Sequence, residues 1–220
     1  MRALILLLGT LSSASAAVLS FQDMAHAVIP DGDSSGLVRS IAVNAPGQSI
    51  LGVEVDIRVT AASLHQPFLG DLYIYLSNGT SLSALANRPG RRDGSSAGYS
   101  DNQPLDVTFS SIGADFHNYR LTVSGSNNIP LTAPLEGTWQ ADGRSADPAQ
   151  VLDTSARNAG LDLFTGQVAT GSWRLFAVDL STGAVHVLES WTLRLTTVPE
   201  PGTTALSLAG ALVCLTRRRS

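Results

Sequence analysis

Apolar and polar residues alternate along much of the chain, with the period of two that places every second side chain on one face of a β-strand. The alternation is clearest in residues 166–179 and 183–196, where Trp173 and Trp191 are each followed by apolar residues two and four positions further on. Residues 180–183 between the two stretches include turn-forming Ser, Thr and Gly. The pattern therefore predicts an antiparallel hairpin whose two neighbouring strands each bury a tryptophan.

Shorter alternating stretches fill the rest of the central region. Further strands are expected at residues 37–43, 50–60, 71–76, 81–86, 105–110 and 119–123, with a tight hairpin across Asn78-Gly79. Residues 17–28 are expected to form a short lead-in, 87–102 a long loop and 130–162 an irregular segment. Because no stretch shows a sustained helical period, we expect an all-β fold, an antiparallel β-sandwich of jelly-roll type.

The N-terminal residues have the layout of a secretory signal peptide. Arg2 supplies the basic region, residues 3–11 supply the apolar region, and Ala14-Ser15-Ala16 fits the small-x-small rule for cleavage. Cleavage between Ala16 and Ala17 would give an exported mature chain that starts at Ala17. The alternative is a short buried N-terminal helix.

The C-terminal residues 198–220 form a tail of three parts. Pro199, Glu200 and Pro201 form a spacer that is incompatible with a helix, residues 203–215 are apolar, and Arg217, Arg218 and Arg219 follow. An apolar helix of this length would extend about 20 Å, which is short for a bilayer core of about 30 Å. This layout resembles the PEP-CTERM sorting signal of bacteria. The resemblance implies an exosortase-type sorting enzyme as partner and a transient stay in the inner membrane, whereas the alternative is a plain tail anchor.

Removing both ends changes the charge balance of the chain. The whole sequence has a formal net charge of −4 and contains no lysine. The segment 17–197 keeps 10 of the 14 arginines and 17 of the 18 acids, so its net charge is −7. This balance argues against nucleic acid as a partner. The single cysteine, Cys214, lies in the tail, so the mature domain has no disulfide framework.

Several short motifs occur along the chain. In order they are Ile29-Pro30-Asp31, Gly70-Asp71-Leu72, residues 104–109, residues 135–139, Gly171-x-Trp173 and Ser190-Trp191. Together they resemble the P domain (P/Homo B), the module that follows the catalytic domain in subtilisin-like proprotein convertases and also occurs alone in bacterial exported proteins. The resemblance covers residues 28–197 and implies a β-sandwich associated with serine endopeptidases. The catalytic domain itself is absent from this chain.

Two motifs loosely resemble parts of a subtilisin-like active site. Gly79-Thr80-Ser81 resembles the surroundings of the nucleophile, and Asp33-Ser34-Ser35-Gly36 the aspartate motif, with His65 between them. The three segments span too little chain for a catalytic domain, and Ser81 falls in a predicted hairpin turn where no oxyanion hole is expected. We therefore expect no enzymatic activity.

Four aspartates are candidate ligands for Ca²⁺. Asp71 and Asp179 lie at strand ends within the P-domain-like motifs, and Asp101 and Asp106 lie in or near the acidic loop. Carboxylate and carbonyl oxygens are the ligands that Ca²⁺ prefers. The alternative is that these aspartates cap turns by accepting backbone N–H bonds. The four histidines show no ligand-like spacing, and no other cofactor is expected.

Together these features predict an exported, non-catalytic domain with a structural or adhesive role at the cell surface or in the exopolysaccharide matrix. Surface polysaccharide is one expected partner. The rival hypothesis is an accessory domain that docks on a separate subtilisin-like protease and stabilises it.

Overall fold

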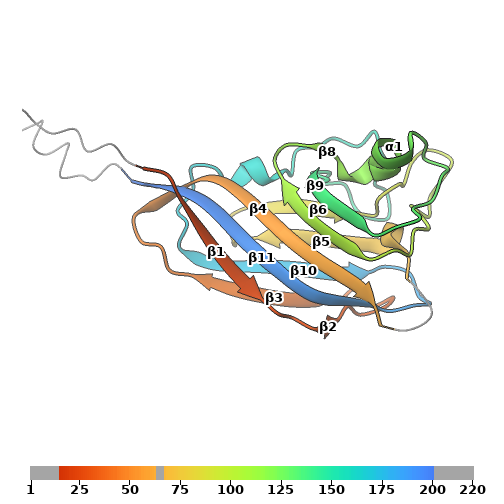
Figure 1. The fold of residues 1–220 in the computed structure, drawn as a ribbon, viewed down its shortest axis with the longest axis horizontal. Helices are drawn as coiled ribbons and strands as arrows, with labels where there is room; N and C mark the ends of the chain where they lie inside the picture. Colours follow the sequence, from red (N-terminus) through yellow and green to blue (C-terminus); the bar gives the residue numbers. More distant parts are fainter. Residues whose placement is uncertain (1–14, 63–66, 201–220) are drawn as a thin grey trace, which may run out of the picture.

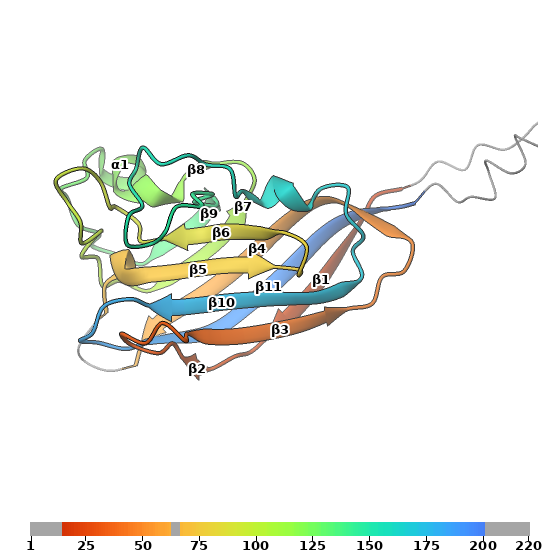
Figure 2. The ribbon, with the colours of Figure 1, turned by 180° about the vertical axis from the view of Figure 1, so that it is seen from behind.

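The computed structural model describes residues 15–62 and 67–200, which fold as two stacked β-sheets (Figure 1, Figure 2). The seven-stranded sheet has the order β1-β11-β4-β7-β9-β8, with β2 also paired to β11. Its strands are β1 (Ala17–Asp23), β2 (Ala27–Val28), β4 (Gln48–Ala61), β7 (Leu105–Ser110), β8 (Ala114–Asp115), β9 (Leu135–Gln140) and β11 (His186–Pro199). The four-stranded sheet has the order β3-β10-β5-β6, with β3 (Leu37–Val43), β5 (Leu72–Ser77), β6 (Leu82–Asn87) and β10 (Gly171–Asp179).

The prediction of an all-β sandwich is confirmed. All pairs of the four-stranded sheet are antiparallel. In the seven-stranded sheet β9 runs parallel to both β7 and β8, so that sheet is mixed rather than purely antiparallel. The one α-helix of the described residues is α1 (Tyr119–Ser124), and short 3-10 turns occur at η1 (Leu69–Asp71), η2 (Phe116–Asn118) and η3 (Leu161–Phe164).

The predicted hairpin of the two tryptophan strands is wrong. β10 pairs with β3 on one side and β5 on the other, whereas β11 pairs with β1, β2 and β4 of the other sheet. Both edges of β10 are therefore occupied, and the segment after Asp179 crosses between the layers. Trp173 and Trp191 belong to opposite sheets and are 1% and 0% exposed.

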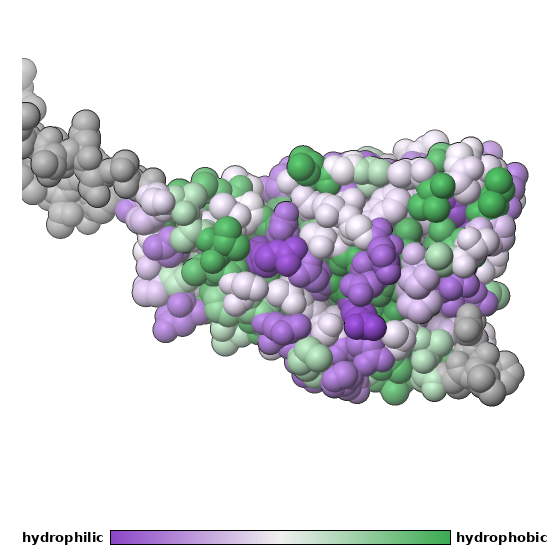
Figure 3. Space-filling view, in the orientation of Figure 1, coloured by the Kyte–Doolittle hydropathy of each residue, from purple (hydrophilic) through white to green (hydrophobic). Residues whose placement is uncertain are grey.

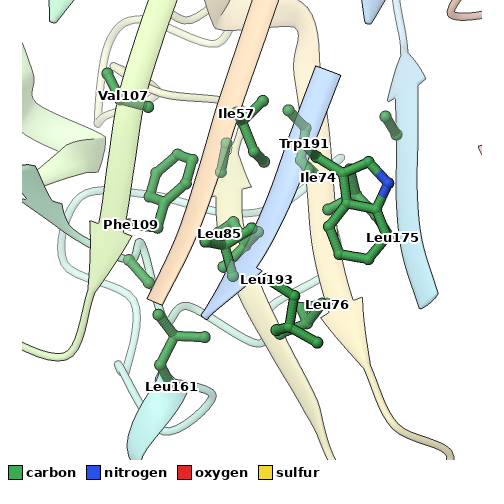
Figure 4. Close-up of a cluster of buried hydrophobic side chains, with 14 of the residues drawn as sticks. Ile57, Ile74, Leu76, Leu85, Val107, Phe109, Leu161, Leu175, Trp191 and Leu193 are labelled. Atoms are coloured by element: carbon green, nitrogen blue, oxygen red, sulfur yellow. The ribbon is translucent and has the colours of Figure 1, made fainter. Parts of the chain in front are cut away.

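The predicted inward faces are correct, because alternation is a local property of each strand. Trp173, Leu175 and Ala177 of β10 are buried, as are Trp191, Leu193 and Leu195 of β11. Figure 4 shows the interior filled from both layers. Its labelled side chains are Ile57, Val107, Phe109, Trp191 and Leu193 of the seven-stranded sheet, Ile74, Leu76, Leu85 and Leu175 of the four-stranded sheet, and Leu161 of η3.

Most predicted strands are found where the alternation placed them. Residues 37–43 and 105–110 coincide with β3 and β7, and β4 contains the predicted 50–60. The hairpin across Asn78-Gly79 is formed by β5 and β6. Asn78 Oδ1 accepts the N–H groups of Thr80 and Ser81, and Gly79 has the positive φ of 86° that the turn requires.

Three segments differ from the prediction. Residues 119–123 form the helix α1, which ends at Gly125 in the left-handed conformation, instead of a strand. The segment expected to be irregular contains β9. The expected lead-in contains β1, which pairs with β11 from Ala17 opposite Thr197 to Asp23 opposite Trp191, and β2. The sandwich therefore includes residues before position 28.

The outer face of the seven-stranded sheet carries a polar ladder. Arg194 of β11 donates to Glu54 (3.1 Å) and to Asp56 Oδ1 (2.7 Å), both on the neighbouring β4. Thr108 of β7 continues the ladder by donating to Asp56 at 2.7 Å. In Figure 3 strongly hydrophilic residues gather near the middle of this face, between apolar patches. Cross-strand pairs of this kind fix the register of the exposed face.

Candidate functional site

Asp71 and Asp179, two of the predicted calcium ligands, come together at one end of the four-stranded sheet. Asp71 ends the turn η1 just before β5, and Asp179 is the last residue of β10, paired with Leu72. Ser181 bridges the two carboxylates: its hydroxyl donates to Asp71 Oδ1 at 2.8 Å and its backbone N–H donates to Asp179 Oδ1 at 3.1 Å. The two acids are 9% and 1% exposed.

Each of the two carboxylates also has a basic neighbour. Arg88 Nη2 donates to Asp71 Oδ1 at 3.0 Å, and His186 Nδ1 lies 2.7 Å from Asp179 Oδ2. Burial raises the pKa of the Asp71 carboxyl above its ordinary value; the hydrogen bond from Ser181 opposes this rise, and the negative charge of Asp179 adds to it. His186 Nε2 is buried and has no hydrogen-bond partner in the described part of the chain.

A cavity of about 250 Å³ opens beside this pair. Phe68, which is 45% exposed, stands at the cavity, and the lining is Pro67, Phe68, Asp71, Asp179, Ser181, Thr182, Gly183 and Ala184. Two carboxylates beside one arginine give the cavity a negative bias, which suits a cation more than an anion. Calcium binding by Asp71 and Asp179 stays a prediction, in which the Ser181 hydroxyl oxygen would be a further ligand.

Asp101 and Asp106 do not join this pair. The buried Asp101 carboxylate accepts bonds from the Tyr119 hydroxyl (2.6 Å), from Arg120 Nε (2.7 Å) and Nη2 (2.9 Å), and from the Leu131 N–H (2.7 Å). Its four acceptor positions are thus occupied by protein donors, and its role here is to anchor α1. Asp106 is exposed on β7, opposite Arg58 of β4. Among residues 15–62 and 67–200 no group of three or more His, Cys, Asp or Glu side chains is placed to hold a metal ion.

A second buried ionic cluster was not anticipated from the sequence. His117 is fully buried, with Nδ1 2.8 Å from Asp142 Oδ2 and Nε2 2.8 Å from the Arg91 carbonyl oxygen. Asp142 also accepts from the Asn87 N–H and from Arg144, which binds Asp115 at 2.8 Å. The three segments that supply these residues, 87–91, 115–117 and 142–144, lie more than 20 positions apart and follow no motif, so only the assembled loops bring them together.

The protease-like motifs do not assemble a catalytic site in the described residues. Ser81 is at the end of the β5–β6 turn, where its hydroxyl accepts a bond from Gln167 at 2.7 Å. Asp33 caps an exposed turn by accepting the Ser35 N–H at 2.9 Å. His65 lies outside the described residues. Ser181, beside Asp179 and His186, donates to Asp71 and not to a histidine, so the hydrogen bond that would activate it as a nucleophile is not formed.

The predicted processing residues lie at one end of the sandwich. Ala16 is exposed, and Ala17 begins β1 opposite Thr197. Pro199 is the last residue of β11, and the Glu200 N–H donates to the Gly47 carbonyl at 2.8 Å, so these two residues are held against the β3–β4 connection instead of forming a free spacer. Pro201, the apolar run with its predicted helix, and Arg217, Arg218 and Arg219 lie outside the described residues. No helix within the described ranges is long and apolar enough to cross a membrane.

Comparisons with known proteins include a partial match to a solved structure. No protein-family model matches the chain, and no curated protein matches it. The crystal structure of a serine protease of Aeromonas sobria matches with a TM-score of 0.42 and 16% sequence identity. The match covers 84% of this chain and 27% of that protease, so this chain spans about a quarter of its length. A likeness at this level establishes neither a family nor an activity.

Proposed function

We propose that this protein is an exported, non-catalytic P/Homo B-like module that acts as a structural or adhesive component of the bacterial cell surface or exopolysaccharide matrix. The observation that supports this proposal is the position of the two chain ends. Ala17 is opposite Thr197 in the sheet, and both ends of the sandwich leave on the side away from α1 (Figure 1, Figure 2). A domain held through its tail would therefore present its α1 end to the surroundings.

The sorting tail is the second part of the proposal. An exosortase-type enzyme recognises the Pro-Glu-Pro motif while the apolar run and the three arginines keep the tail in the inner membrane. Pro199 is paired with Gln48 of β4, and the Glu200 N–H donates to the Gly47 carbonyl. The enzyme therefore cleaves at the end of the sandwich or first displaces its last residues. Cleavage then releases the sandwich to the surface.

The proposal assigns no catalysis to the domain. Ser81 and Asp33 are used in turns, and Ser181 is used to bridge two carboxylates. The rival assignment, an accessory domain for a separate subtilisin-like protease, rests on the resemblance of the Gly70-Asp71-Leu72 and Gly171-x-Trp173 motifs.

Cell fractionation with surface proteolysis tests the proposal. The protein expressed from the complete sequence is expected, after processing, in the surface or matrix fraction, accessible to added protease on intact cells. A variant expressed without residues 198–220 is expected to lose this retention. Equal retention of the shortened variant would contradict the role of the tail. Co-purification with a subtilisin-like protease, together with loss of that protease's activity when this chain is deleted, would replace the proposal with the rival.

A further inference from the structure

The loop after β6 forms a cavity lined by two neighbouring arginines. Beyond Asn87 the chain turns through Arg88 and Gly90, both with positive φ, before it reaches Arg91 and Arg92. Gly90 is required at its position, because a Cβ there would lie 2.3 Å from the ring of the buried Tyr99. The Gly90 N–H also donates to the His117 carbonyl at 2.8 Å. The loop is therefore fixed to the core.

The cavity has a volume of about 300 Å³. Its lining is Arg91, Arg92, Asp93, Gly94, Ser95, Ser96 and Leu152. Serine hydroxyls and the backbone of a glycine-containing turn add neutral hydrogen-bond donors to the two guanidinium groups.

Arg91 is a buried cation without an acidic partner. The residue is 8% exposed. Nη2 donates to the Ala149 carbonyl at 2.7 Å, while Nε is buried and has no acceptor in the described part of the chain. Burial lowers the pKa of Arg91 and the positive charge of Arg88 lowers it further, while the negative charge of Asp147, which forms no ion pair with Arg91, partly opposes the shift. A buried charge in this state is costly unless an anion joins it.

Arg92 is bound only to neutral acceptors. Its Nη1 donates to the Gly90 carbonyl and its Nη2 to Asn128 Oδ1, both at 3.2 Å. Asp93, the one acid of the lining, is exposed and forms no ion pair with either arginine. Elsewhere in the described residues most arginines are paired with acids, namely Arg39, Arg88, Arg120, Arg144, Arg157 and Arg194. Of the described arginines that form no ion pair, Arg91 and Arg92 line the same cavity.

We propose that this cavity binds an anionic group, and that its ligand is the carboxylate of a uronic acid unit in an acidic polysaccharide. Arg92 and Arg91 hold the carboxylate by charge-assisted hydrogen bonds, and Ser95 and Ser96 bind neighbouring hydroxyl groups. The bond from Arg92 to Asn128 places the cavity beside the segment that follows α1, at the end of the sandwich away from Ala17 and Pro199 (Figure 1). The polysaccharide as the source of the anion rests on the proposed function, whereas the anion site itself does not.

Titration calorimetry of the full chain in detergent with a short oligogalacturonate tests the site. The oligomer is expected to bind, more weakly as salt is added, and its methyl ester of the same length is expected not to bind. Arg92→Gln should weaken binding about 10- to 100-fold, since it removes a charged hydrogen-bond donor. Arg174→Gln is the matched control, because Arg174 is exposed on β10, far along the chain from this loop, and forms no ion pair among the described residues.

Each remaining outcome is decisive. No binding of the oligogalacturonate, or equal binding by Arg92→Gln, overturns the site. Binding of inorganic phosphate or sulfate without the oligogalacturonate overturns the assignment to a uronate. Arg91→Gln is not used alone, because the side chain is buried and its loss can unfold the loop. Surface retention of Arg92→Gln is expected to be unchanged, so failure of this site and failure of the proposed function are separate results.

Discussion

Ala17 of β1 lies opposite Thr197 of β11, so the first residue of the predicted mature chain and the last residues before the sorting tail are neighbours in one sheet. The predicted export cleavage site and the predicted sorting tail therefore adjoin the same end of the domain. The pairing also means that seven residues expected to be a lead-in are part of the sandwich.

The first prediction concerns processing. The surface-located protein is expected to start at Ala17 and to lack Cys214 and the arginines at 217–219. Replacing Pro199 and Glu200 together by alanine should leave the chain in the inner membrane, because the sorting motif is lost. Intact-mass measurement of the native protein checks this, and surface material that still ends at Ser220 would refute the sorting hypothesis.

The second prediction concerns β1. Phe21 is partly buried against the core, whereas Val18 on the same strand is 64% exposed. Phe21→Ala should therefore lower the free energy of unfolding by about 1–3 kcal/mol, less than for a fully buried phenylalanine. Val18→Ala should change it by less than about 0.5 kcal/mol. Urea denaturation measures the free energy of unfolding of both variants. Equal values would mean that residues 17–23 do not contribute to the packed core and act only as a lead-in.

The third prediction separates two aspartates that lie five positions apart. Asp101→Asn weakens the partner of the buried Arg120, which should cost about 3–5 kcal/mol of stability. Asp106→Asn should cost almost nothing, because Asp106 is exposed. Thermal melts of the two variants provide the measurement. Similar melting temperatures would mean that the Asp101 cluster does not anchor α1.

The fourth prediction concerns acid stability. Burial alone would raise the pKa of Asp115, but the hydrogen bond and charge of Arg144 outweigh it, so the pKa lies below its ordinary value. The hydrogen bond from Arg39 likewise lowers the pKa of Asp23. A carboxyl with a lowered folded-state pKa stabilises the protein above its unfolded pKa of about 4, and this stabilisation is lost as the pH falls through the folded value.

Unfolding free energy should therefore drop as the pH is lowered below about 4. Asp115→Asn should be less stable than the native chain at neutral pH and should lose less on acidification, because one linked carboxyl is gone. Urea denaturation at a series of pH values tests this, with Asp106→Asn as the control. Parallel curves for the Asp115 variant and the native chain would exclude the linkage.

The fifth prediction concerns calcium. If Asp71 and Asp179 hold Ca²⁺ beside their cavity, Ca²⁺ at about 100 times its Kd should add about 2.7 kcal/mol to stability. A chelator should then lower the melting temperature of the native chain, and Asp71→Asn should remove the difference between the two conditions. Asp106→Asn should keep it. A melting temperature that does not change with chelator would contradict calcium binding. Asp71 and Asp179 would then serve only as hydrogen-bond partners of Ser181, Arg88 and His186.

The sequence alone determined which side chains face inward along each strand. The positions Trp173, Leu175, Trp191 and Leu193 could be assigned because strand alternation needs only neighbouring residues. The Asn78-Gly79 turn could be assigned for the same reason, since its backbone geometry depends on those residues themselves.

The tertiary structure decided which strands pair and which polar residues meet. An edge of N–H and C=O groups accepts any strand, so alternation could not tell that β10 and β11 belong to opposite sheets. The stretch 119–123 has alternating apolar residues, yet Leu121 and Val123 are exposed while Arg120 is buried on Asp101, because that buried carboxylate needs a charged donor. The cavity of Arg91 and Arg92 likewise depends on the assembled loops, which bring residues 91–96 beside Leu152.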